Sequence, residues 1–181
     1  MGLAPELSDG QIRLTGFGPA DVEDHLSGED DEHAKRFGWY PERSTILTVT
    51  AAIERWQHQW TTGGRTRAFA VRSISHGKLV GGVELRLRDE DVADISYWVN
   101  ANFRRQGIAA RATTLASEYA FAKLGVERIE ALIEPDNVGS LQTALKVGFT
   151  NEGLLRSRST FGSERRDMVI LGLIPSDLAT P

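Results

Sequence analysis

One segment of the chain reads Phe103-Arg104-Arg105-Gln106-Gly107-Ile108-Ala109-Ala110, and it joins a strand-like run, Ile95 to Val99, to a helix-like run, Ile108 to Leu124. The first N–H groups of a helix have no partners within the helix, and the helix dipole adds about half a positive charge at that end. Phosphate oxygens can bind to such a turn without a dedicated side chain. Because Arg104 and Arg105 add charge beside it, the segment predicts an anion site.

The spacing of glycines limits which anion site this turn can form. A P-loop requires G-x-x-x-x-G-K-[S/T] and a dinucleotide-binding turn requires G-x-G-x-x-G, whereas this turn has one glycine, Gly107. The remaining pattern is R-x-x-G-x-A, formed by Arg104, Gly107 and Ala109. It is similar to the pyrophosphate-binding pattern Q/R-x-x-G-x-G/A of the GCN5-related N-acetyltransferase (GNAT) family. The plain alternative is a surface helix start flanked by arginines.

Segments on both sides of the turn strengthen this resemblance. The pattern N-x-x-S-x-x-x-x-x-x-x-G-F runs from Asn137 through Ser140 to Gly148 and Phe149. It resembles the second conserved segment of the GNAT family, in which a helix headed by asparagine flanks the pantetheine arm of coenzyme A. Before the turn, Asp94-Ile95-Ser96-Tyr97-Trp98-Val99 is similar to the A-E-I-G-Y-W strand of one branch, which contains the ribosomal-protein N-terminal (RimJ/RimL-type) acetyltransferases.

The order of elements extends the resemblance from Gln11 to Ile174, and the segment from Arg166 to Leu171 resembles the last strand of that branch. A chain of 181 residues, of which 40% are hydrophobic, has room for one ordinary core. We therefore expect one N-acetyltransferase domain at residues 11–175, an N-terminal tail at 1–10 and a C-terminal tail at 176–181.

The hydrophobic pattern predicts an α/β fold of the α+β kind. Ala68 to Ile74 and Lys78 to Arg88 form a hairpin, and Val92 to Val99 adds a third antiparallel strand before the turn. The helix that follows is a crossover, so the next strand pairs in parallel. We expect a mixed, mostly antiparallel sheet of about six to seven strands with helices on both faces. The family resemblance implies a central splay in this sheet, where acetyl-CoA lies.

The resemblance also implies how acetyl-CoA is held. Backbone N–H groups of the turn bind the pyrophosphate, and the exposed edge of the strand near Val99 pairs with pantetheine, which brings the thioester carbonyl close to a backbone N–H. The helix headed by Asn137 flanks the same arm. The residues expected to bind the cosubstrate are Val99, Arg104, Arg105, Gln106, Gly107, Ile108, Ala109, Asn137 and Ser140.

The catalytic residues are less well specified. GNAT enzymes commonly place a tyrosine seven residues after the asparagine to protonate the thiolate, but this chain has Ala144 there. Ser140, which is similar to a serine of the ribosomal-protein branch, is the candidate to hydrogen-bond the sulfur; alternatively it bonds only to the helix backbone. For the general base we keep two candidates, Asp94 at the acid position of A-E-I-G-Y-W and Glu84 on the preceding strand. Glu84 could instead simply pair with a neighbouring arginine.

Other features bear on the acceptor. The acidic run Glu29-Asp30-Asp31-Glu32 is typical of a solvated loop or helix end. The family resemblance implies instead that it lines the acceptor entrance, where four carboxylates would favour a cationic amine. Ile53, Trp56 and Trp60 recur at helical spacing, which indicates core packing rather than ligand contact. The four histidines show no spacing typical of a metal site or a catalytic triad. We expect a protein N-terminal α-amine or a small-molecule amine as acceptor, or else a non-catalytic acyl-CoA-binding module.

Composition narrows the remaining classes. The chain has no cysteine, which excludes disulfides, a cysteine-based zinc site and a thiol nucleophile, and we expect no metal. A net charge of −4 argues against nucleic acid as the main partner. No signal sequence or membrane-length apolar run is evident, so we expect a cytoplasmic protein without a membrane partner, either a monomer or a homodimer.

Overall fold

The computed structural model describes residues 2–37, 41–88 and 91–178. Eight strands form one sheet in the order β1-β2-β3-β4-β5-β6-β8-β7. All neighbouring strands are antiparallel except the pair β5 and β6, which is parallel. The strands are β1 (Leu7–Ser8), β2 (Ile12–Thr15), β3 (Thr66–Ser73), β4 (Leu79–Leu87), β5 (Val92–Val99), β6 (Arg128–Ile133), β7 (Thr150–Phe161) and β8 (Glu164–Leu173).

The expected fold class is confirmed, with a small difference in the number of strands. The additional short strand is β1, whose Leu7 lies opposite Leu14 of β2. It lies in the segment expected to be an N-terminal tail. Two residues are too few to show the alternation by which a strand is predicted from sequence.

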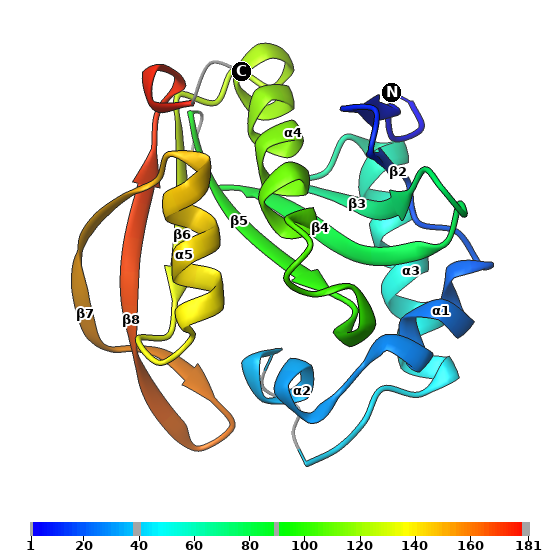
Figure 1. Ribbon diagram of the computed structural model, residues 1–181, viewed down its shortest axis with the longest axis horizontal. Helices are drawn as coiled ribbons and strands as arrows, with labels where there is room; N and C mark the ends of the chain where they lie inside the picture. The colour runs from blue at the N-terminus through cyan, green and yellow to red at the C-terminus, as the bar shows by residue number, and fades with distance from the viewer. Residues whose placement is uncertain (1, 38–40, 89–90, 179–181) are drawn as a thin grey trace.

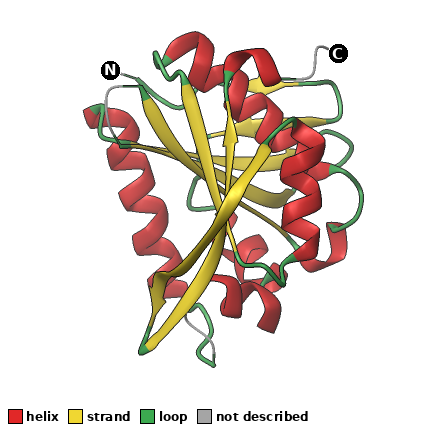
Figure 2. Cartoon of the chain, turned by 90° about the vertical axis from the view of Figure 1, so that its left-hand side faces the viewer, coloured by secondary structure: helices red, strands yellow, loops and turns green. Residues whose placement is uncertain are grey.

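Helices cover both faces of the sheet, as Figures 1 and 2 show. Helices α4 and α5 pack together on one face, and α3 lies against β3 on the other, with α1 beside it. The described helices are α1 (Asp21–Gly28), α2 (Asp31–Phe37), α3 (Ile46–Thr62), α4 (Ile108–Lys123) and α5 (Val138–Val147), with short 3-10 helices η1 (Ala101–Phe103) and η2 (Pro175–Asp177). None of the helices in the described ranges is long and apolar enough to cross a membrane.

The sheet opens between β5 and β6. These strands pair only from Val92, opposite Arg128, to Asp94, opposite Glu130. Beyond that point β6 continues along β8, whereas β5 continues along β4 as far as Val99. The two strands diverge in Figure 1, and the C-terminal half of β5 has no strand partner on this side among the described residues. The expected central splay is therefore present.

Small and apolar side chains hold the layers together. Ala112, Ala116 and Ala120 of α4 are buried, and they let this helix lie close to the sheet. Trp60 of α3 is buried in the same cluster, against Phe69 with ring centroids 5.0 Å apart and beside Tyr119 of α4. Core packing was therefore the right expectation for Trp60.

Helix α3 begins at Ile46, with Thr45 as its N-cap. Thr45 and Thr48 cap it reciprocally, because each accepts a hydrogen bond from the backbone N–H of the other. The N-terminal part of α3 then lies beside a cavity between this helix and the sheet. Thr48, Val49 and Ala52 are among the residues that line the cavity.

Candidate active site

The predicted anion turn lies between η1 and α4, with its backbone bent so that a ligand can approach. Arg105 and Gly107 have φ angles of 60° and 77°, in the left-handed region. Gly107 is the N-cap of α4, so the N–H groups of Ile108 and Ala109 lie at the open end of the helix. An added Cβ at Gly107 would meet nothing within 4 Å. The space beside the turn is therefore free in the protein itself.

The two arginines of the turn differ in what they contact. The Arg104 guanidinium donates to both carboxylate oxygens of Asp30, over 2.6 and 2.8 Å, and its Nε donates to the Val99 carbonyl over 3.2 Å. This contact lowers the pKa of Asp30, because the hydrogen bonds stabilise the charged carboxylate. Arg105 is exposed and makes no ion pair with the rest of the described chain. Arg105, rather than Arg104, supplies a guanidinium that a phosphate could bind.

A cleft of about 750 Å³ runs from this turn between α2, β5 and α5. Its lining includes eight of the nine residues expected to bind acetyl-CoA, and it lacks only Gln106, whose side chain lies 3.5 Å from the carbonyl of Asn102. The eight are Val99, Arg104, Arg105, Gly107, Ile108, Ala109, Asn137 and Ser140. The splay of β5 from β6 thus brings together segments that are about 40 residues apart in sequence.

Ser140 lies at the start of α5, where its contacts are well defined. The Asn137 side chain caps the helix by accepting from the Ser140 N–H over 3.2 Å. The Ser140 hydroxyl donates to the Tyr97 hydroxyl over 3.0 Å, and Tyr97 donates in turn to the Ser140 carbonyl over 3.0 Å. Ala144, at the position of the family tyrosine, is fully buried and faces the core.

Sequence reasoning did not single out Tyr97. Side chains alternate along a strand, so Tyr97 shares a face of β5 with Ile95 and Val99, the face toward the cleft. The alternation of side chains along β5 was the signal in the sequence that could have indicated Tyr97. Only the structure shows that this face of β5 meets α5. Burial raises the pKa of Tyr97 to about 12, so its hydroxyl stays protonated at neutral pH.

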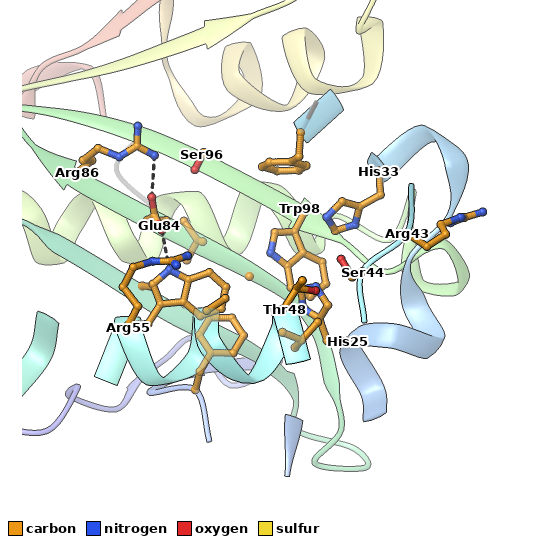
Figure 3. A pocket seen from close by; sticks show the side chains of 18 of the residues that line it. His25, His33, Arg43, Ser44, Thr48, Arg55, Glu84, Arg86, Ser96 and Trp98 are labelled. Carbon is orange, nitrogen blue, oxygen red and sulfur yellow. Dashed lines mark hydrogen bonds and ion pairs between the residues drawn. The ribbon is translucent and has the colours of Figure 1, made fainter. Parts of the chain in front are cut away.

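A second cavity, of about 500 Å³, lies on the opposite face of β4 and β5, between these strands and helices α1 and α3 (Figure 3). Six of its lining side chains have aromatic rings, and Phe17 stacks on Trp56 with centroids 4.5 Å apart. Trp56 therefore lines a cavity as well as packing in the core, so core packing alone was too narrow an interpretation of its helical spacing. His33, Phe37 and Trp98 line both this cavity and the cleft.

Of the two candidate bases, only Glu84 lies in this cavity. Its carboxylate accepts from Trp56 Nε1 over 2.9 Å and from Arg86 over 2.8 Å, and it lies across the β4–β5 pair from Ser96. A carboxylate can accept about four hydrogen bonds, so these two leave Glu84 able to accept more. Figure 3 shows Glu84 and Ser96 on the same side of the cavity.

Asp94 is placed elsewhere. It pairs with Arg88 over 3.2 Å and lines neither cavity. It is five residues before Val99 on the same strand, which corresponds to about 16 Å. Burial raises the pKa of Asp94, because its charged form is poorly solvated there. The structure thus separates two carboxylates that the sequence could not tell apart.

Two histidines from different helices pack against Trp98. The ring centroids of His25 and His33 lie 4.8 and 5.1 Å from that of Trp98. Burial lowers the pKa of both, and that of His33 falls to about 4, so both rings are neutral at pH 7. Gly82 makes room for Trp98, because an added Cβ there would lie 2.5 Å from Trp98 Nε1.

The acidic run, which spans the start of α2, is paired with cations or backbone, although Asp31 and Glu32 are exposed. Besides the pair between Asp30 and Arg104, Asp31 pairs with Arg43 over 2.6 Å. The other two members are also engaged: Glu32 pairs with Arg36 over 2.7 Å, and Glu29 accepts from the Ser44 N–H over 3.0 Å. This pairing weakens the expectation that the run attracts a cationic amine.

These features agree with the comparison to known proteins. The family description "Acetyltransferase (GNAT) domain" matches residues 11–150. The chain belongs to the GNAT family. The family inferred from the turn and from the segments around it is therefore confirmed.

The chain is also similar to individual proteins of known sequence. It is 31% identical over 112 residues to YjcK of Bacillus subtilis (strain 168), which is named as an N-acetyltransferase, and the match covers 60% of this chain and 62% of YjcK. The chain thus spans somewhat less than two thirds of the length of that relative.

Two solved structures share the fold. The microcin C7 self-immunity acetyltransferase MccE, in complex with acetyl-CoA and AMP, has a TM-score of 0.81 at 23% identity over 92% of this chain and 93% of MccE. RimL, the ribosomal L7/L12 alpha-N-protein acetyltransferase in complex with coenzyme A, has a TM-score of 0.82 at 14% identity over 94% and 98%. The resemblance to the RimJ/RimL branch is thus confirmed in the fold.

Proposed function

We propose that this protein is an N-acetyltransferase that transfers the acetyl group of acetyl-CoA directly to a primary amine. One observation carries the proposal: the cleft that contains the anion turn and the second cavity share three lining residues, His33, Phe37 and Trp98, so the two spaces adjoin there. A donor in the cleft and an acceptor in the cavity would meet at the C-terminal half of β5. Direct transfer requires the donor and the acceptor to meet in this way. The chain has no cysteine that could instead carry the acetyl group between separate sites.

The donor is held mainly by backbone. The free N–H groups at the start of α4 bind the pyrophosphate of acetyl-CoA, with the Arg105 guanidinium as an additional partner. Pantetheine then runs along the edge of β5 that β6 leaves unpaired, up to Val99. In this arrangement the sulfur lies near Ser140, on the cleft side of β5.

The reaction is an aminolysis of a thioester. The neutral amine nitrogen attacks the carbonyl carbon, the carbon–sulfur bond breaks, and the amine proton passes to Glu84, directly or through a water molecule. The electron pair of the broken bond goes to sulfur, where the Ser140 hydroxyl stabilises the thiolate by a hydrogen bond. We assign the base to Glu84 rather than Asp94, because only Glu84 lines the cavity in which the amine would lie.

The acceptor belongs to one of two classes. A protein N-terminal α-amine is supported by the likeness to RimL, which is named for acetylation of such an amine. Its pKa of about 7.7 to 8.0 leaves roughly a tenth of it neutral at pH 7, so it demands little of the base. A small-molecule amine is supported by the cavity volume of about 500 Å³, which is typical of small-ligand sites.

In either class, the cavity favours an apolar body next to the amine. Aromatic rings form part of its walls, and its charged lining groups are three guanidinium groups and two carboxylates, from Arg43, Arg55, Arg86, Glu42 and Glu84. The carboxylates of the acidic run are also paired. The described lining therefore lacks enough carboxylates to neutralise an acceptor that carries several positive charges. We therefore propose a monoamine with an aromatic or bulky apolar group and disfavour polyamines. We expect the reaction to take place in the cytoplasm.

Release of free thiol from acetyl-CoA, measured with a panel of amines, tests the proposal. The panel comprises phenethylamine, spermidine, and two short peptides that differ only in a first residue of phenylalanine or serine. We expect the aromatic amine and the phenylalanine peptide to give the highest kcat/KM. Preference for spermidine would contradict the acceptor assignment, whereas tight acetyl-CoA binding without turnover of any acceptor would indicate a non-catalytic acyl-CoA-binding module.

A further inference from the structure

We infer that Tyr97 is a positioning residue for the acetyl transfer, and that it directs the Ser140 hydroxyl toward the sulfur of coenzyme A as the thiolate forms. The inference rests on the proposed function, because it assumes that Ser140 hydrogen-bonds the sulfur. It adds a residue that neither the turn nor the second conserved segment contains.

The observation is a closed pair of hydrogen bonds between β5 and α5. The Ser140 hydroxyl donates to the Tyr97 oxygen, and the Tyr97 hydroxyl donates to the Ser140 carbonyl, each over 3.0 Å. A hydroxyl has one proton to donate and lone pairs with which to accept. In this arrangement the Ser140 proton is therefore used by Tyr97 and cannot also reach a sulfur atom.

Formation of a thiolate changes which arrangement is favourable. The charged sulfur is a stronger acceptor than a phenol oxygen, so the Ser140 O–H turns to it. The Tyr97 O–H can then turn from the Ser140 carbonyl to the Ser140 Oγ, and only the two hydroxyl protons rotate. Tyr97 neither gains nor loses a proton, and its donation strengthens the bond that Ser140 makes to sulfur.

The surrounding structure keeps both oxygens in place. Ser140 is fixed by the Asn137 cap of α5, and Tyr97 by the β4–β5 ladder, in which it lies opposite Val83. Burial of Tyr97 disfavours its ionised form, so the phenol remains a donor through the reaction. The phenol thus reaches α5 from a neighbouring strand, while Ala144 of α5 itself is buried in the core.

Tyr97→Phe tests the inference because it removes one oxygen and keeps the ring. The loss of a single hydrogen bond predicts a fall in kcat of about three- to tenfold, with the KM for acetyl-CoA changed by less than about twofold. If Tyr97 acts only through Ser140, the double variant with Ser140→Ala is no slower than Ser140→Ala alone. The matched control is Tyr119→Phe, since Tyr119 of α4 lines neither cavity; this variant should keep wild-type kcat.

A binding measurement makes the test independent of turnover. As the pH rises, the affinity for coenzyme A should increase relative to the affinity for desulfo-coenzyme A, because Ser140 stabilises the thiolate form of coenzyme A. Tyr97→Phe should reduce this gain in relative affinity. If Ser140→Ala leaves kcat and this gain unchanged, the proposed role of Ser140 is wrong. If Ser140→Ala is slow but Tyr97→Phe matches wild type in both measurements, only the role of Tyr97 is overturned. Additive effects of the two substitutions would likewise overturn it.

Discussion

Arg104 and Asp30 form a two-point ion pair, with distances of 2.6 and 2.8 Å between the guanidinium and the carboxylate oxygens. Asp30 also accepts from the His33 N–H over 2.9 Å at the start of α2. The pair therefore joins the end of β5 to the segment that carries His33, a residue that lines both the cleft and the cavity. The arginine of the R-x-x-G-x-A pattern is thus engaged within the protein, and we propose that the backbone and Arg105 bind the pyrophosphate.

The first prediction compares these two arginines. Arg105→Gln should weaken acetyl-CoA binding by about two- to fivefold and reduce its dependence on salt, because Arg105 is exposed and has no carboxylate partner among the described residues. Arg104→Gln should change the affinity for acetyl-CoA less, and should mainly raise the KM for the acceptor. Calorimetric titration at low and high salt checks both variants; a larger loss of affinity in Arg104→Gln would contradict this division of roles.

The second prediction concerns the approach of phosphate to the turn. Gly107→Val should raise the Kd of acetyl-CoA at least about tenfold, because the side chain occupies space that only the ligand uses. Gly77→Val is the matched control, since Gly77 has a φ of 69°, also has nothing within 4 Å of an added Cβ, and lines neither cavity. Both variants should lose about 1 to 2 kcal/mol of stability from backbone strain. Equal acetyl-CoA affinities in the two variants would show that the turn does not bind the pyrophosphate.

The third prediction separates the two carboxylates. Glu84→Gln should lower kcat about a hundredfold at pH 7, within the range for loss of a general base. The deficit should shrink as the pH rises, because more of the acceptor amine is already neutral. Asp94→Asn should keep kcat close to wild type, since Asp94 lies outside the cavity. A pH profile of kcat for the two variants decides the question, and the reverse pattern would return the role to Asp94.

The fourth prediction follows from the buried histidine at the junction. The pKa of His33 is lowered from 6.5 to about 4, mainly by burial, with His25 and Arg104 acting in the same direction and Glu29 and Asp30 opposing them. The neutral ring therefore favours the folded state above pH 6.5, and this contribution is lost as the pH falls toward 4. At about 1.4 kcal/mol per pKa unit, the loss amounts to about 3 kcal/mol.

Urea unfolding of wild type and His33→Gln at pH 7 and pH 4.5 measures this contribution. Other carboxylates also titrate in this range, so the relevant quantity is the difference between the two proteins. The free energy of unfolding should fall more steeply with decreasing pH in the wild type than in the variant. Parallel pH dependence would mean that His33 is not held neutral by burial.

The sequence could predict the turn and the helix that line the cleft because their determinants are local. Gly107 and the residues around it specify a turn by spacing alone, and Asn137 and Ser140 specify a capped helix in the same way. The alternation in β4 and β5, followed by a crossover helix, was also enough to predict the sheet and its change from antiparallel to parallel pairing. The short strand at Leu7 escaped prediction because it has no periodicity of its own.

The acceptor side depends on contacts between distant segments, and the sequence could not supply them. His25, His33 and Trp98 come from two helices and a strand, and no spacing relates them. Glu84 and Asp94 looked equivalent as acids on neighbouring strands until the register showed Glu84 opposite Ser96. Tyr97 became visible only where the face of β5 that carries it meets α5.

The most direct test of the central claim is the rate of thiol release from acetyl-CoA by the wild-type protein, measured with and without an aromatic monoamine, together with the mass of the amine product. The account predicts acceptor-dependent release, with one acetylated amine formed for each thiol. Acetyl-CoA binding with no acceptor-dependent release, for the aromatic amine and for the peptide acceptors alike, would contradict it.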